Sequence, residues 1–448
     1  MEMVLEFLRD VLSQPALLIG IMSCIGLIAL KRPFHKVMTG TLKPILGYLM
    51  LAAGAGVIVN NLDPLGKMIE HGFHITGVVP NNEAIVAVAQ KVLGVETMSI
   101  LVVGLLMNLC IARFTKFKYV FLTGHHSLFM ACLMSAVLGT AGLSGMELIL
   151  VGGFLMGAWS AISPAIGQSY TSKVTEGDEI AIGHFGSLGY YLSAWVAKYV
   201  GKADDSTEDI EIPEKWGFLR DSTLSTALTM IVFYLIAAFA AGSEFVATLS
   251  GDMSPYLYAV MSAMNFAVGV TIVYSGVRMI LGDLIPAFQG IATKIIPNAI
   301  PAVDCAVFFT YAPTAVVLGF ISSFIGGIIG MLILGAVGGV LIIPGLVPHF
   351  FCGATAGIYG NATGGRRGAA VGAFLNGLAI TFLPALALPV LGQLGFQNTT
   401  FGDADFAVMG LVLGHAFEWI GMAGIYGIVA IAALVLIIPN FIKTKGKV

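Results

Sequence analysis

The chain has 448 residues, of which 57% are hydrophobic and only 10% are charged, and its mean hydropathy is +0.93. Soluble domains carry about 25% charged residues, so this composition excludes a soluble globular protein and indicates a helical chain that crosses a membrane several times. The formal net charge of −3 says little about partners, and no nucleic acid is expected among them.

Apolar runs long enough to span a bilayer, roughly 17–25 residues each, follow one another along the chain and predict about eleven crossings. They lie near residues 12–30, 40–59, 96–112, 119–139, 146–164, 222–246, 255–280, 308–337, 339–358, 370–392 and 407–441. Two further segments, 65–95 and 284–306, are shorter, are interrupted by proline and glycine, and occupy matching places in the two halves. Paired interrupted segments of this kind indicate the binding site of a transporter.

The two halves also resemble each other in sequence. Three matches occur in order: Gly56-Val57 with Gly276-Val277 at an offset of 220, Thr76–Asn81 with Thr293–Asn298 at 217, and Tyr119–Gly124 with Val340–Gly345 at 221. A nearly constant offset close to half the chain predicts a duplicated unit. With the offset of 217, Asn82 and Glu83 take the places of Ala299 and Ile300.

Basic residues in short loops predict the orientation, because such loops stay on the cytoplasmic side. They are Lys31, Arg32, Lys36, Arg113, Lys116, Lys118, Arg366, Arg367, Lys443, Lys445 and Lys447. All fall on one side if the N-terminus is outside and the C-terminus is cytoplasmic. The second half then starts on the opposite side from the first, as an inverted repeat requires.

The predicted fold is therefore an all-α polytopic membrane protein, with about 11 transmembrane helices in a 5+5 inverted repeat plus one and with re-entrant or broken segments. We expect residues 1–164 to form the first membrane repeat and 165–221 to form an amphipathic helix and an acidic cytoplasmic linker. Residues 222–392 would form the second membrane repeat, and 393–448 the last span and a basic cytoplasmic tail.

The stretch Ile295–Asp304 places two prolines and a carboxylate inside an apolar sequence. The prolines predict a break in the helix, covered by protein or water. A charged side chain at the centre of a bilayer costs about 2.5–3.5 kcal/mol on insertion scales, so Asp304 is expected to face a polar cavity. The alternative is a kinked helix with a protonated or hydrogen-bonded Asp304.

Histidines supply the other candidate polar groups. His125 and His126 are adjacent, and neighbouring helical residues diverge by about 100°, so one ring is expected to face the cavity and the other a neighbouring helix. The alternative for each is a buried ring bonded to the backbone. His184, near the cytoplasmic side, could bind an anion or lie at a wet interface. Glu83 could equally be a solvated residue at the edge of a loop.

Cofactor and catalytic motifs are not found in the sequence. There is no P-loop, no dinucleotide fingerprint and no nucleophile elbow, so neither a cofactor nor a catalytic residue is expected. The five cysteines lie in apolar segments without paired spacing, which is typical of small buried side chains rather than disulfides or metal ligands. They are Cys24, Cys110, Cys132, Cys305 and Cys352.

Over nearly its whole length the chain resembles the ascorbate-specific permease (IIC) components of the bacterial phosphotransferase system. The motifs that carry the resemblance are Leu122-Thr-Gly-His125, Ile182-Gly-His184, Ala302-Val-Asp-Cys305, Tyr311-Ala-Pro313 and Leu341-Ile-Ile-Pro-Gly345. The resemblance implies a homodimer in the bacterial inner membrane, with a core domain that moves past a scaffold domain. It also implies L-ascorbate as substrate, phosphorylated on entry by a separate EIIB subunit that receives its phosphoryl group through EIIA and HPr.

The family's substrate contacts, carried over by position, fall on Asn82, Glu83, His125, His126, Phe129, His184, Phe185 and Asp304. Three places depart from the family. Phe129 and Phe185 stand where the family has glutamines, and Asn82-Glu83 replaces Thr-Tyr. A buried donor left without its partner costs about 1–3 kcal/mol, so these changes could alter specificity toward a related sugar acid or polyol.

Two other functions compete with this one. A proton-coupled secondary transporter would use Asp304 or Glu83 to exchange a proton for a small polar or anionic metabolite. An intramembrane enzyme would use the histidines directly.

Overall fold

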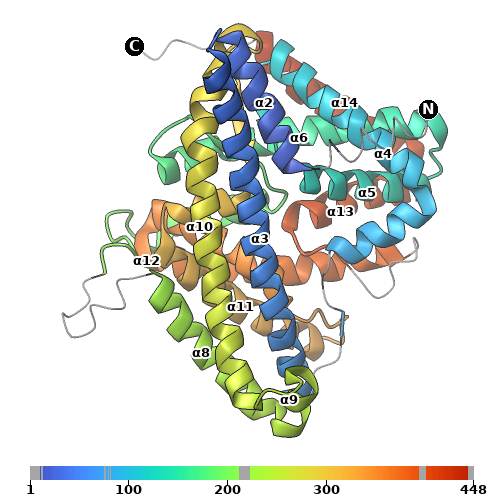
Figure 1. The fold of residues 1–448 in the computed structure, drawn as a ribbon. Coiled ribbons are helices and arrows are strands. Elements are labelled where there is room, and N and C mark those ends of the chain that lie inside the picture. The colour runs from blue at the N-terminus through green and yellow to red at the C-terminus, as the bar shows by residue number, and fades with distance from the viewer. Residues whose placement is uncertain are drawn as a thin grey trace.

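The structure, a computed structural model, describes residues 11, 14–74, 77–78, 80, 82–210, 222–392 and 400–441. Most of them are helical (Figure 1). The helices are α2 (Pro15–Ala29), α3 (Phe34–Gly72), α4 (Asn82–Phe114), α5 (Gly124–Thr140), α6 (Gly145–Thr175), α7 (Ser187–Val200), α8 (Ser222–Ala241), α9 (Ser243–Ser250), α10 (Pro255–Lys294), the short 3₁₀ helix η2 (Cys305–Thr310), α11 (Pro313–Ala336), α12 (Leu346–Gly392), α13 (Ala404–Ile420) and α14 (Met422–Phe441).

Among the described residues, 7 helices are long and apolar enough to cross a membrane, or 8 if α8 and α9, which meet at a bend of 117°, form one broken span. This confirms a mostly helical polytopic membrane protein. The predicted total of eleven stays a prediction, since α2 has only 15 residues and α5 only 17.

Several predicted spans differ from the helices observed. The run 119–139 starts as a strand and becomes helical only at Gly124. The runs 339–358 and 370–392 belong to a single helix, α12, which is broken at Gly364 and Gly365. The run 407–441 is two helices that meet at Gly421, whose φ of 67° ends α13. Hydropathy alone cannot distinguish these cases, because apolar turns and strands score like apolar helix.

Two predicted boundaries also shift. α3 and α10 continue to Gly72 and Lys294, so the backbone leaves the helix after these residues, well inside the predicted segments 65–95 and 284–306. The predicted domain boundary at 164/165 falls inside α6, which continues past Pro164 to Thr175. The four-part division otherwise stays a prediction.

A small parallel sheet lies among the helices, contrary to the all-α prediction. Its strands are β1 (Tyr119–Phe121), β2 (Ala181–Ile182) and β3 (Ile300–Val303), in the order β1-β3-β2. β3 pairs Ile300 with Tyr119 and Ala302 with Ala181. These strands satisfy backbone groups that the helix breaks leave free, which a protein interior in a membrane requires.

Helix bounds recur 222 positions later in the chain. α3 and α10 end at residues 72 and 294, α4 and α11 end at 114 and 336, and α5 and α12 begin at 124 and 346. At this spacing Asn82 corresponds to Asp304. The offset of 217, which set Asn82 against Ala299, disagrees with these bounds, because the similar Pro-Asn pairs lie at different distances from the helices that follow them.

Strand pairings recur in exchanged form. Besides the sheet, isolated bridges join Val78 to Ile342 and Pro80 to Thr400. The second bridge is matched by the pair Ala302–Ala181, and the first, within one residue, by Pro301–Val120. Each half therefore lends its broken segment to strands of the other half.

α3 and α10 cross in close contact through glycines, and Figure 1 shows them side by side. A Cβ on Gly54 would lie 2.7 Å from the carbonyl oxygen of Gly269, and one on Gly276 would lie 2.6 Å from that of Gly47. Only glycine permits such an approach. Because residue numbers rise along α3 as they fall along α10, the two helices are antiparallel.

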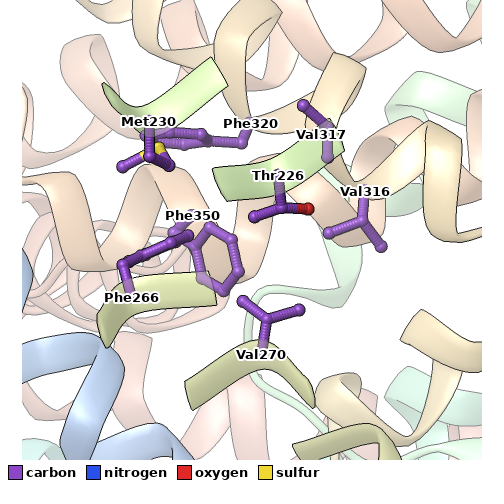
Figure 2. A pocket seen from close by; sticks show the side chains of 8 residues that line it. All are labelled: Thr226, Met230, Phe266, Val270, Val316, Val317, Phe320 and Phe350. Atoms are coloured by element: carbon purple, nitrogen blue, oxygen red, sulfur yellow. The ribbon is translucent and has the colours of Figure 1, made fainter. Parts of the chain in front are cut away.

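The helices form two groups. We call α2, α3, α8, α9 and α10, which pack on one another, the crossing unit. We call the three strands with α4–α7, η2 and α11–α14 the site unit. Where α8 and α10 face α11 and α12, apolar side chains surround a cavity of about 10 Å³, which is room for a single water (Figure 2). Its lining residues include Val270 and Phe350.

Candidate functional site

Asp304 lies where β3 ends and η2 begins, at the predicted helix break. Its Oδ1 accepts a hydrogen bond from the Ala306 N–H at 3.0 Å, so the carboxylate caps η2. Its Oδ2 lies 3.5 Å from Nε2 of His125. Both expected roles are therefore present: Asp304 is hydrogen-bonded to the backbone, and it also faces another polar side chain.

His125 and His126 occupy the first turn of α5 and have different surroundings, as expected for neighbouring residues. Nδ1 of His125 lies 3.3 Å from the Tyr48 hydroxyl, and 37% of this side chain is exposed. His126 is buried, and its Nδ1 accepts a hydrogen bond from the Phe185 N–H at 3.3 Å. His125 is therefore the more accessible of the two rings.

His184 follows β2 and turns inward. Its Nδ1 lies 2.8 Å from the Tyr190 hydroxyl and 3.2 Å from the Gly186 N–H. The centre of its ring is 3.8 Å from that of His126. His184 is only 4% exposed, so the expectation of a wet interface is wrong: the turn after β2 directs the ring into the protein.

Phe129 and Phe185 form an aromatic wall beside the histidines. The Phe129 ring centre lies 5.8 Å from that of His125 and 5.7 Å from that of His126. Phe185 stacks on Phe121 with 4.6 Å between ring centres, and Phe406 stacks on His126 at 5.6 Å. The histidines are therefore held between apolar rings that offer no hydrogen bonds.

Asn82 begins α4 and binds a residue 321 positions away. Its amide donates to Oδ2 of Asp403 at 2.6 Å, and its oxygen accepts from the Gly402 N–H at 2.9 Å. The Cys352 thiol donates to Oδ1 of the same carboxylate, also at 2.6 Å. The side chain of Glu83 lies outside the described residues. The other seven predicted side chains belong to one cluster, which Asn82 joins through Asp403.

Asp403, Cys352 and Tyr48 belong to this cluster and were not predicted. Asp405 supports it from behind, because its carboxylate accepts from the Leu188 N–H at 2.9 Å and the Ser187 hydroxyl at 2.8 Å, which caps α7. The usable signal was the run Gly402-Asp-Ala-Asp405, two carboxylates directly before an apolar helix, which sequence reasoning assigned to an outer turn.

Comparison with known proteins decides the family. A profile of the PTS system sugar-specific permease component (EIIC-GAT) matches residues 10–405. The chain belongs to this family. One curated relative, the ascorbate-specific PTS system EIIC component of Mycoplasma pneumoniae, is 28% identical over 417 residues, which cover 80% of this chain and 62% of the relative. The chain thus spans less than two thirds of that relative's length.

A metal could in principle enter this permease component at His184, Cys352 and Asp403, whose donor atoms lie within 4.8 Å of one another. Structural zinc sites use four ligands at about 2.0–2.3 Å. Here the thiol donates to the carboxylate, and Nδ1 of His184 is engaged by Tyr190. Hydrogen bonds among protein groups account for these three side chains.

The cluster suits binding better than bond-breaking chemistry. His126, His184, Asp304 and Asp403 expose at most 8% of their surface. Imidazole, amide and carboxylate groups together offer donors and acceptors for hydroxyl groups, and aromatic faces complete a small site. Such a site suits the sugar-type ligand of a permease component.

Proposed function

We propose that this permease component carries L-ascorbate, or a related sugar acid, across the bacterial inner membrane as the EIIC subunit of a phosphotransferase system. The observation that carries the proposal is the closed polar cluster, which brings His125 of the first half against Asp304 of the second. The printed name of the Mycoplasma relative supports the choice of ascorbate. Substrate would be phosphorylated on entry by EIIB, supplied by EIIA and HPr.

Substrate recognition would use His125, His126, His184, Asp304 and Asn82. His125 and Asp304 form the contact best placed to open toward a ligand, because His125 is the most exposed of the three rings. Phe129 and Phe185 would pack on the ligand without reading its hydroxyl groups. This arrangement favours a small molecule whose polar groups lie toward the imidazoles.

The inverted repeat would allow alternating access, with the site unit sliding past the crossing unit like an elevator. Two observations support it: the common spacing of 222 residues between matching helix ends, and the antiparallel crossing of α3 and α10. Matching helices that run in opposite directions are what a two-fold axis in the membrane plane produces.

We propose further that the N-terminus is outside and the C-terminus cytoplasmic, and that the chain forms a homodimer. Asp205 of the acidic linker pairs with Arg366, which places these two segments on one side of the membrane. Glu208 of the same linker accepts from the Thr314 and Ala315 N–H groups at the start of α11. The basic residues predict that this side is cytoplasmic.

Calorimetric titration of the purified chain tests the proposed substrate. L-ascorbate should bind saturably at one site per chain, whereas D-glucose should give no binding heat. If neither ascorbate nor related sugar acids bind, the proposed substrate class is wrong.

A proton-coupled carrier is the second candidate, favoured by the His125–Asp304 pair, which could exchange a proton. Uptake into membrane vesicles separates the two. Accumulation that requires EIIB and a phosphoryl donor supports the phosphotransferase function. Accumulation driven by a proton gradient without that donor would support the carrier, and conversion of substrate by the purified chain alone would indicate an enzyme.

A further inference from the structure

Tyr48 provides a polar contact between the two helix groups. It lies on α3 in the crossing unit, is 6% exposed, and places its hydroxyl 3.3 Å from Nδ1 of His125 in the site unit. α3 itself is held against α10 by the glycine contacts, so the hydroxyl has a fixed position in the crossing unit.

This contact selects the protonated nitrogen of His125. A neutral imidazole has one donor and one acceptor nitrogen, and a phenol beside Nδ1 can donate to it. The proton then lies on Nε2, which faces Oδ2 of Asp304 at 3.5 Å. Tyr48, His125 and Asp304 thus form a chain of polar contacts from the crossing unit to the helix break.

The corresponding position in the other half is different in chemistry. Val270, 222 residues after Tyr48, faces α11 and α12 across the small apolar cavity (Figure 2). One half therefore meets the site unit through a hydroxyl and the other through an imperfectly filled apolar contact. The asymmetry indicates that the hydroxyl of Tyr48 serves the site rather than the packing of the repeat.

We infer that Tyr48 is a positioning residue that orients His125 for substrate, and does so only in the arrangement of the two units seen here. The inference rests on the proposed alternating access. If the site unit slides along α3, the hydroxyl stays with the crossing unit and His125 leaves it. Substrate affinity and the relative position of the units are coupled through this one contact.

The test compares Tyr48→Phe with Tyr234→Phe, each of which removes one hydroxyl and leaves the ring. Tyr234, on α8, donates to the carbonyl oxygen of Asn61 within the crossing unit and is a matched control. Two readouts are measured: the Kd for L-ascorbate, and the rates at which N-ethylmaleimide alkylates Cys305 and Cys352, which are buried beside the cluster. Buried Cys132 and exposed Cys110 report any general loosening.

Tyr48→Phe should raise the Kd, and the alkylation rates of Cys305 and Cys352, by about 2- to 12-fold, the range expected for one net hydrogen bond. Tyr234→Phe should change neither by more than about 2-fold, and Cys132 should stay protected in both. If Tyr48→Phe behaves like Tyr234→Phe, the inference is wrong.

A second background tests whether Tyr48 acts through His125. In a His125→Ala chain, adding Tyr48→Phe should not increase alkylation further, and a full additional increase would overturn the inference. If the unmodified chain does not bind ascorbate, the proposed function fails instead, while the alkylation rates still test Tyr48.

Discussion

Two corresponding helix starts, 222 residues apart, carry different chemistry. Asn82 at the start of α4 is occupied by protein groups, Asp403 and the Gly402 N–H. Asp304 at the start of η2 uses one oxygen for the helix and turns the other toward His125. The same backbone break is thus closed internally in one half and left available in the other. This difference teaches that a break supplies a place for polar groups, and that the side chains decide whether the place is structural or binding.

The largest expected effect is that of Asp304→Asn on binding. An amide can still cap η2, but the interaction of a charged oxygen with His125 and substrate is lost. A hydrogen bond to a charged group contributes about 1.5–3 kcal/mol, so the Kd for L-ascorbate should rise about 10- to 150-fold, with insertion into the membrane unchanged. Unchanged binding by calorimetry would remove Asp304 from the site.

The two adjacent histidines should separate binding from stability. His125→Ala should raise the Kd about 10-fold with little change in Tm, because His125 is exposed toward the ligand. His126→Ala leaves the Phe185 N–H without its partner, which should lower the free energy of unfolding by about 1–3 kcal/mol and affect binding less. Calorimetry and thermal unfolding of both variants measure this, and the reverse order would mean that the two rings are assigned wrongly.

Asn82→Ala sharpens the comparison from the closed side. Removing the amide takes a donor from buried Asp403, and should lower the free energy of unfolding by about 1–3 kcal/mol, with a smaller change in Kd than Asp304→Asn causes. Thermal unfolding and titration of the two variants side by side give the answer. A larger binding loss for Asn82→Ala would place substrate at the start of α4 instead.

The smallest expected effect is that of Cys352→Ser. A serine hydroxyl can donate to Asp403 as the thiol does, so Kd and Tm should both stay close to those of the unmodified chain. A zinc-dependent Tm that Cys352→Ser abolishes would show instead that the thiol, His184 and Asp403 hold a metal.

Local chemistry made the helix break predictable, because Pro297 and Pro301 cannot continue a hydrogen-bonded helix. The apolar runs likewise predicted most helices. The strands were not predictable in this way, because Tyr119–Phe121 and Ile300–Val303 are short apolar segments that fit a membrane helix equally well. Their strand form depends on partners far along the chain.

The candidate site was partly predictable for the same reason. Histidines and an aspartate in an apolar sequence stand out, and His125, His126, His184 and Asp304 do come together. Asp403 was missed because its partner Asn82 lies 321 positions away and its neighbours suggest an outer turn. The duplication was recognised, but the Pro-Asn match set Asn82 against Ala299, whereas helix ends align it with Asp304.

The most direct test is a cryo-EM map of the chain with L-ascorbate. Density for the ligand should contact His125 and Asp304 within the cluster that joins the two halves. Density elsewhere, such as in an enlarged cavity beside Val270 and Phe350, with the polar cluster still closed, would contradict the account.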